Sequence, residues 1–170
     1  DFKKLENLNG QHIRATGDAV LLRQIEALFA AQQKAPLGDE RRALMLDAMP
    51  GIKGRAKTLL EVIDLSYYIL TDRPLELDEK AAKLLNSETA PMLARLTERL
   101  RDASEWVAEN IETTVREAAE SEGIKLGKLA QPLRAAVTGR AISPSVFDVM
   151  VTLGREETLA RLGDVVRKTG

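Results

Sequence analysis

Apolar side chains recur at intervals of three and four residues along most of this chain, which is the period of a helix that buries one face. The first two stripes are Val20–Phe29, which follows a capping candidate at Thr16 or Asp18, and Leu59–Leu70. Strand signals are nearly absent, because aromatic residues make up only 4% of the chain and β-branched residues do not cluster. The sequence therefore predicts an all-α fold.

Further stripes follow in the second half of the chain, and glycine or proline separates most of them. They are Met92–Leu100, Val107–Ala118 before Gly123, Leu126–Val137 before Gly139, Val146–Leu153 before Gly154, and Leu159–Val166. Ser143 and Pro144 are typical of the N-cap and first turn of a helix. We expect a helical hairpin or bundle in the middle of the chain, followed by three short helices with tight turns.

Segment 71–78 (TDRPLELD) interrupts the helical spacing. It contains Pro74, which lacks a backbone donor and stops a helix. A chain of 170 residues is long enough for one domain or two small ones. We therefore place a boundary between two helical subdomains in this segment.

The composition excludes several kinds of chemistry. Because the chain has no cysteine, disulfides, thiolate metal sites and a cysteine nucleophile are impossible, and a reducing cytoplasm fits. His12 is the one histidine, and the carboxylate pairs at 78–79 and 156–157 lie in first turns of helices, where acidic residues are expected anyway. No apolar run approaches the roughly 18 residues of a membrane helix. We expect no catalytic group, no metal site and no membrane contact.

Charge is unevenly distributed along the chain, although the net charge is only -1. The balance of Lys and Arg over Asp and Glu is +3 in residues 1–60, -7 in residues 61–120 and +3 in residues 121–170. A chain with basic ends can present a local positive face to a phosphate backbone. Solvated helix faces produce the same pattern, so charge alone leaves both interpretations open.

Two bends combine glycine or proline with arginine. Gly51–Arg55 does not have the spacing of a phosphate-binding loop. It is typical of a turn into a helix, with Arg55 and Lys57 near the positive end of that helix. We expect the backbone N–H groups at this end to face outward, where they can hold an anion or a base edge. Pro132 bends or begins a helix beside Arg134, and we expect the second turn, Ser143–Pro144, to come together with that arginine as a small surface. Arginine donors beside an apolar surface are suited to bind unpaired bases, because the donors reach the base edge and the apolar surface covers the base face. A solvated turn and an ordinary helix–helix joint are the structural alternatives.

Several blocks of the chain, in order, resemble the C-terminal half of bacterial glutamyl-tRNA synthetases. Residues 4–14 (KLENLNGQHIR) are similar to the family's Lys-Leu-x-Trp-Leu-Asn-x-x-Tyr-Ile-Arg segment, with Asn7 where Trp is usual and His12 where Tyr is usual. The other blocks are RAKTL at 55–59, GKLAQPLRAAVTG at 127–139, SPSVF at 143–147 and LGREETLARL at 153–162. The family's His-Ile-Gly-His-like and Lys-Met-Ser-Lys-Ser-like nucleotide motifs are absent, so the resemblance is to the part of the enzyme beyond its ATP site.

The resemblance implies stem-contact helices in residues 1–17, then two small helical-bundle, or α-helix cage, anticodon-binding subdomains in residues 18–77 and 78–170. Arg55 matches the arginine that reads the third anticodon base in the family. The positions that match contacts to the other two bases are Arg134, Ser143, Pro144 and Val146. The positions expected to face the tRNA backbone are Lys3, Lys4, Arg14 and Lys57.

The resemblance further implies that a full-length parent enzyme uses ATP and Mg²⁺ to attach glutamate to tRNA(Glu), whereas this part alone holds no cofactor and is inactive. We expect a monomeric, cytoplasmic protein. Two alternatives stay open: a helical protein-interaction module, and the same region of an enzyme that also charges tRNA(Gln). Arg55 bears on the second alternative, because a bulky donor there favours one third base over another.

Overall fold

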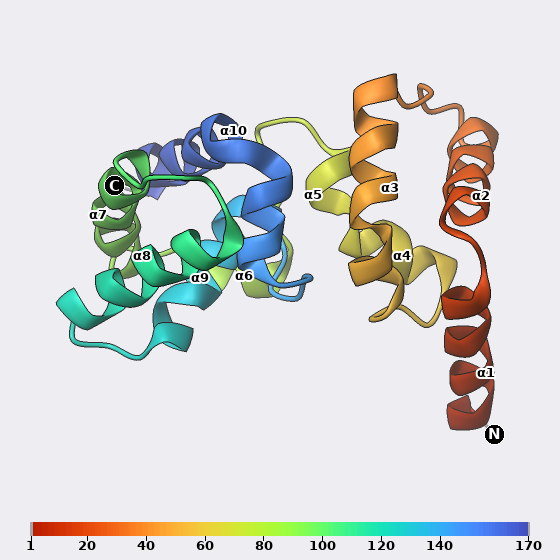
Figure 1. Ribbon diagram of the computed structural model, residues 1–170, viewed down its shortest axis with the longest axis horizontal. Helices are drawn as coiled ribbons and strands as arrows, with labels where there is room; N and C mark the ends of the chain where they lie inside the picture. Colours follow the sequence, from red (N-terminus) through yellow and green to blue (C-terminus); the bar gives the residue numbers. More distant parts are fainter. Residues whose placement is uncertain (1, 170) are drawn as a thin grey trace. The chain divides into compact units, whose positions relative to one another are not determined.

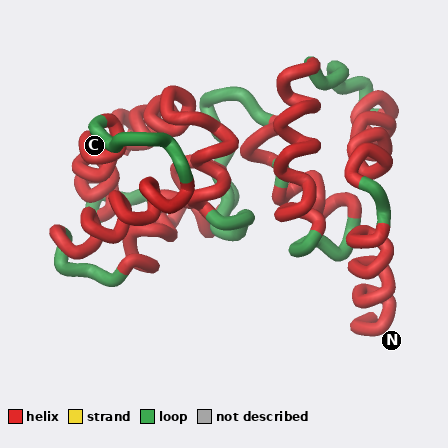
Figure 2. The backbone as a smooth tube through the Cα atoms, viewed as in Figure 1, coloured by secondary structure: helices red, strands yellow, loops and turns green. Residues whose placement is uncertain are grey.

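The computed structural model describes the backbone of residues 2–169 and the side chains of residues 9–169. Helices joined by loops make up this part of the chain, and it contains no strand, which confirms the predicted all-α fold (Figures 1 and 2). The helices are α1 (Phe2–Ala15), α2 (Asp18–Ala31), α3 (Asp39–Lys53), α4 (Leu59–Leu65), α5 (Tyr67–Leu70), α6 (Glu79–Leu84), α7 (Thr89–Arg101), α8 (Ala108–Ser121), α9 (Leu126–Thr138) and α10 (Val146–Thr169).

The chain divides into two compact units, Asp1–Leu70 and Thr71–Gly170. The division falls at the first residue of segment 71–78, where the sequence places a boundary. Helix α1 belongs to the first of these units.

In the first unit, α2 packs against α3, and the short helices α4 and α5 complete the core (Figure 1). Its fully buried apolar side chains include Leu21, Leu22, Ile25, Met45, Met49, Ile52 and Val62. Neither candidate cap of α2 caps it: Gly17 is the N-cap residue, and the Thr16 hydroxyl instead donates to the carbonyl oxygen of His12. Asp18 lies in the first turn of α2.

Helix α3 continues through the stretch predicted to be a turn. Pro50 and Gly51 lie inside the helix, and the turn begins only at Gly54. Met45, Met49 and Ile52 explain the difference, because all three are fully buried at intervals of four and three residues. Burial of this stripe outweighs the helix-breaking tendency of Pro50 and Gly51.

In the second unit, α10 packs against α7, α8 and α9, and α6 packs against α9. The expected stripes supply the core, with Leu93, Leu96, Leu100, Ile111, Val115, Leu129 and Leu133 all fully buried. Val107, expected in one of these stripes, is instead 44% exposed, because it precedes α8 as its N-cap residue. Arg95 on α7 binds Glu122 at the end of α8 through two hydrogen bonds of 2.6 and 2.7 Å, which hold the pKa of that carboxyl below its ordinary value.

Glycine ends helices at the three predicted positions. Gly123, Gly139 and Gly154 have φ angles of 71°, 75° and 82°, a backbone region that suits glycine. Gly154 divides α10, as the sequence predicts, into one helix before it and one after it. The predicted N-cap at Ser143 is wrong, because α10 begins only at Val146 and the Ser143 hydroxyl has other partners.

Candidate nucleic-acid interface

The turn at 54–58 presents Arg55 to solvent. Its side chain is exposed, and within residues 9–169 it makes no hydrogen bond or ion pair. The turn itself is held firmly: the backbone N–H of Glu61 donates to the Thr58 hydroxyl, and the Glu61 carboxylate accepts from the backbone N–H of Lys57, both at 3.1 Å. The expectation that backbone donors of this helix face outward to hold an anion is therefore not met at Glu61. The turn offers an arginine side chain on a rigid frame.

Gly10 brings α1 close to the same turn. A Cβ atom built on Gly10 would lie 3.2 Å from Arg14 Nη1, 3.7 Å from Lys57 Cγ and 3.9 Å from the carbonyl oxygen of Ala56. Two predicted backbone-binding cations, Arg14 and Lys57, thus lie beside one glycine, and Lys57 follows Arg55 by two residues. Both side chains are exposed. The other two predicted cations, Lys3 and Lys4, have side chains outside the described residues.

Lys53 ties the start of this turn to the junction between α1 and α2. Its ammonium group donates to the carbonyl oxygen of Thr16 at 3.0 Å and pairs with Asp18 Oδ1 at 2.7 Å. The Lys53 side chain is only 18% exposed. Because Arg55 follows two residues later, the tie fixes the position of the arginine turn relative to the end of α1.

In the second unit, Arg134 and the Ser143 turn meet as the sequence predicts. Arg134 Nε donates to Ser143 Oγ at 2.9 Å, and Nη1 donates to Gln131 Oε1 at 3.3 Å. The Ser143 hydroxyl in turn donates to the carbonyl oxygen of Pro144 at 2.7 Å. Arg134 is half-buried, so its guanidinium is held in place and still reaches the surface.

The other predicted residues of this turn are buried. Ser143 is 7% exposed, Val146 is 2% exposed, and Pro144 is buried as well. The Val146 side chain packs in the core, so a ligand at this surface can meet only its backbone. Ser143 and Pro144 shape the loop and hold Arg134.

A network of hydrogen bonds fixes the loop between α9 and α10. The Thr138 hydroxyl donates to the carbonyl oxygen of Arg134 at 2.7 Å and accepts from the backbone N–H of Arg140 at 3.0 Å. Arg140 Nη1 donates to the carbonyl oxygen of Glu76 at 3.0 Å, and the backbone N–H of Asp78 donates to the carbonyl oxygen of Gly139 at 2.9 Å. The loop therefore holds its shape without a ligand.

Two surface residues escaped the sequence analysis. Ile142 is 71% exposed and Leu60 is 69% exposed, and no other large apolar side chain of the described part exceeds 44%. Ile142 directly precedes Ser143, and Leu60 lies in the first turn of α4, just after the Arg55 turn. No sequence signal marks either residue, because exposure of an aliphatic side chain depends on the tertiary fold.

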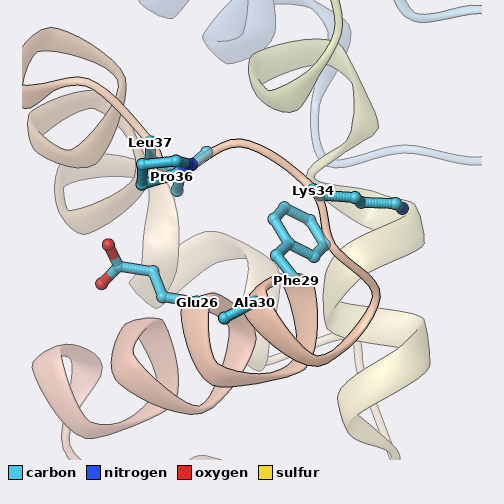
Figure 3. A pocket seen from close by; sticks show the side chains of 6 residues that line it. All are labelled: Glu26, Phe29, Ala30, Lys34, Pro36 and Leu37. Atoms are coloured by element: carbon cyan, nitrogen blue, oxygen red, sulfur yellow. The ribbon is translucent and has the colours of Figure 1, made fainter.

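A small pocket of about 230 Å³ lies elsewhere in the first unit, between the end of α2 and the loop after it (Figure 3). Lys34 reaches over the ring of Phe29, with Nζ 4.9 Å from the ring centroid, and Pro36 and Leu37 line another side. The lining is mainly apolar and contains none of the predicted site residues. Within residues 9–169, no group of three histidine or acidic side chains is placed to hold a metal ion. No helix of the described backbone, residues 2–169, is long and apolar enough to cross a membrane.

The helical fold and the two arginine-bearing turns define an all-helical binding module rather than a nucleotide-binding α/β domain. The sequence matches the anticodon binding domain family over residues 20–166. The chain belongs to this family.

The relatives of this chain are longer proteins. It is 52% identical to "Glutamate–tRNA ligase 1" of Methylobacterium sp. (strain 4-46), over 98% of this chain and 36% of that protein, and 49% identical to "Glutamate–tRNA ligase" of Afipia carboxidovorans, over 96% and 36%. The chain thus spans about a third of the length of the curated relatives it matches. Its fold resembles a glutamate tRNA ligase from Elizabethkingia meningosepticum, crystallised in complex with its amino acid, with a TM-score of 0.75 and 26% identity over 97% of this chain and 32% of that one. These matches confirm the resemblance to glutamyl-tRNA synthetases.

Proposed function

We propose that this chain is the tRNA-binding part of a glutamate–tRNA ligase and recognises the anticodon of tRNA(Glu). The observation that carries the proposal is the pair of turns in which a rigid frame presents an arginine, Arg55 in the first unit and Arg134, bound to Ser143, in the second. In the first unit, Arg14 and Lys57 lie beside Gly10, and Lys57 follows Arg55 by two residues. Residues 1–17 serve as the stem-contact segment, and residues 18–77 and 78–170 as the two anticodon-binding subdomains.

Affinity and specificity come from different side chains in this proposal. Arg14 and Lys57, together with Lys3 and Lys4, attract phosphates without regard to sequence, and this attraction weakens as salt rises. Arg55 and Arg134 donate to the edges of splayed anticodon bases, which are exposed for hydrogen bonding only in a single-stranded loop. The backbone around Ser143, Pro144 and Val146 completes the second contact.

The full-length enzyme, on this proposal, attaches glutamate to tRNA with ATP and Mg²⁺, which bind in parts of the protein outside this chain. The residues present do not fit an ATP site, since Gly51–Lys53 is the last turn of a helix and follows no strand. We propose that the chain acts as a monomer in the cytoplasm and supplies no reacting group: it positions tRNA.

A titration with RNA hairpins tests the anticodon proposal. The hairpins carry the anticodon loop of tRNA(Glu) with each of the four third bases, and binding is measured at two salt concentrations. The wild-type chain should prefer one third base and bind more weakly at high salt, with a steep log–log slope. A salt-insensitive interaction that ignores the loop sequence would favour a protein-interaction module instead.

Two arginine variants test the base-reading role. Arg55→Ala should lower discrimination at the third base, and Arg134→Ala discrimination at another position, by about 1–3 kcal/mol each, the scale of one good arginine–base contact. Lys4→Ala should weaken binding to all hairpins alike. Arg23→Ala on α2 and Arg116→Ala on α8 are matched controls, because both remove an exposed arginine outside the turns. Equal losses for cognate and unrelated hairpins in both turn variants would contradict the role.

The second candidate, an enzyme that also charges tRNA(Gln), differs at the third base only. Arg55 is the residue that bears on it, because its exposed guanidinium is a bulky donor. Direct competition between tRNA(Glu) and tRNA(Gln) for the chain decides between the two candidates: equal affinities would favour the broader specificity.

A further inference from the structure

The two most exposed large apolar side chains of the described residues lie beside the two arginine turns. Leu60 is 69% exposed and follows Arg55 by five residues, and Ile142 is 71% exposed and adjoins Ser143, the partner of Arg134. Single exposed aliphatic residues are ordinary on protein surfaces. The placement of both at the two turns, one in each unit, is what calls for an explanation.

Both side chains are exposed although their backbone is held in place. Leu60 stands in the first turn of α4, which the hydrogen bonds between Thr58, Glu61 and Lys57 fix to the Arg55 turn. Ile142 stands in the loop that Thr138 and Arg140 anchor on one side and the buried Ser143 anchors on the other. Each aliphatic side chain is therefore held in the solvent near a turn that bears an arginine: Leu60 follows Arg55 by five residues, and Ile142 adjoins the serine that binds Arg134.

An arginine beside an apolar surface matches the chemistry of an unstacked nucleobase. The base edge carries hydrogen-bond acceptors and donors, whereas its face is apolar and loses favourable contacts when it leaves the stack. Aromatic side chains usually cover such a face. They are scarce among the described residues: Phe29 and Tyr68 are 9% and 3% exposed, Tyr67 and Phe147 are half-buried, and the ring of Trp106 lies under Arg155, with the guanidinium carbon 5.3 Å from the ring centroid.

We propose that Leu60 and Ile142 are the apolar ledges on which unstacked anticodon bases rest, one base beside Arg55 and another beside Arg134. The proposal rests on the proposed anticodon-binding function and adds two binding residues to it. The arginine contacts the edge of each base, and the aliphatic side chain covers part of its face, as apolar side chains do for bases that are flipped out of a stack.

The test compares ledge variants with matched controls in the complete chain. Leu60→Ser and Ile142→Ser should each weaken binding to the cognate anticodon hairpin about 5- to 10-fold, the lower part of the range for stacking of one base on a side chain. Leu46→Ser on α3 and Val151→Ser on α10 remove aliphatic side chains that are 38% and 40% exposed in the same two units and should change binding less than about twofold. The conservative variants Leu60→Met and Ile142→Val should retain most of the affinity.

Hairpins that lack one anticodon base at a time identify which base each ledge carries. The loss caused by Leu60→Ser should disappear when one particular base is missing, and the loss caused by Ile142→Ser when a different one is missing, because a ledge without its base contributes nothing. The salt slope should stay at the wild-type value, since neither variant removes a charge.

Failure of the ledges and failure of the proposed function give different results. If the wild-type chain binds intact and base-free hairpins equally, the anticodon function itself is wrong. If the wild-type chain prefers the intact hairpin, but Leu60→Ser and Ile142→Ser match their controls or lose the same affinity with every base-free hairpin, the ledge proposal alone is overturned.

Discussion

Lys53 has a role that its sequence does not suggest. The sequence places it in the turn predicted at Gly51–Arg55 and assigns it no partner. In the structure it is mostly buried, and its ammonium group holds the carbonyl oxygen of Thr16 and the carboxylate of Asp18. The charge of Lys53 therefore stabilises the place where the end of α3 meets the junction of α1 and α2.

Replacement of Lys53 should therefore lower the stability of the first unit. Lys53→Met keeps the length of the side chain but leaves the Thr16 carbonyl and the Asp18 carboxylate without their cation, which should lower the free energy of unfolding by about 1–3 kcal/mol. Urea unfolding measures this loss. Lys53→Arg, which keeps the charge, should lose less. An unchanged midpoint in Lys53→Met would show that the junction does not depend on the tie.

Single-residue roles were the hardest to predict from the sequence. The Arg134–Ser143 contact could be expected, because a proline and a serine–proline turn bracket a short helical segment. That Ser143 does not cap the helix could not be predicted, because its hydroxyl oxygen accepts a hydrogen bond from Arg134 in the folded structure. The exposure of Leu60 and Ile142 is likewise a property of the folded surface.

At the scale of elements, Gly154 determines how α10 is built. Its φ of 82° and ψ of 163° lie in a region that is essentially open to glycine alone, and they redirect the chain between two helical stretches. The second stretch then reaches α9 through Arg161, which is 3% exposed and donates to the carbonyl oxygen of Val137 at 2.8 Å. The break thus allows both stretches to pack in one core.

Gly154→Ala should destabilise the second unit by about 1–3 kcal/mol through backbone strain alone. No atom lies within 4 Å of the Cβ that the variant adds, so crowding makes no contribution. Gly127→Ala is the control: it also adds a Cβ in open space, but its φ is not positive, and alanine suits α9 better by about 0.5 kcal/mol. Thermal unfolding measures both. Equal effects of the two variants would contradict the strain argument.

Helices could be predicted well from the sequence wherever an apolar stripe ends at a glycine with positive φ, as at Gly123 and Gly139. The prediction failed where tertiary packing overrode a local signal. Gly51 is the clearest example, because the burial of Ile52 extends α3 past two helix breakers. Local propensity alone cannot predict such an extension, because the extension depends on the core against which Ile52 packs in the folded unit.

At the scale of the whole molecule, charge is nearly balanced within each unit. Residues 1–70 carry 10 basic and 9 acidic side chains, and residues 71–170 carry 15 and 17. Neither unit is therefore attracted to polyanions as a whole. Any attraction for RNA must come from local groups of cations, such as Arg14 and Lys57 beside Gly10.

The two separate cores predict that the units lose their structure separately. Gly154→Ala should speed hydrogen exchange of the slowest amides in α7 and α9 by about tenfold or more, because their exchange requires opening of the strained unit. The slowest amides of α2 and α3, in the other unit, should exchange at the wild-type rate. Exchange followed by mass spectrometry of peptides measures both, and acceleration in all four helices would show that the chain unfolds as one cooperative body.

The Ser143 hydroxyl makes the rotamer entropy that Arg134 loses on binding smaller than the rotamer entropy that Arg55 loses. On the proposed function, Arg134 has lost much of its rotamer entropy before RNA arrives, because Ser143 and Gln131 hold its guanidinium. The exposed Arg55 side chain has no such partner within residues 9–169, so its rotamer entropy is lost only at the moment of contact. Calorimetry should therefore find that contact by Arg55 carries the larger entropic penalty, so that its share of the affinity fades faster on warming than that of Arg134.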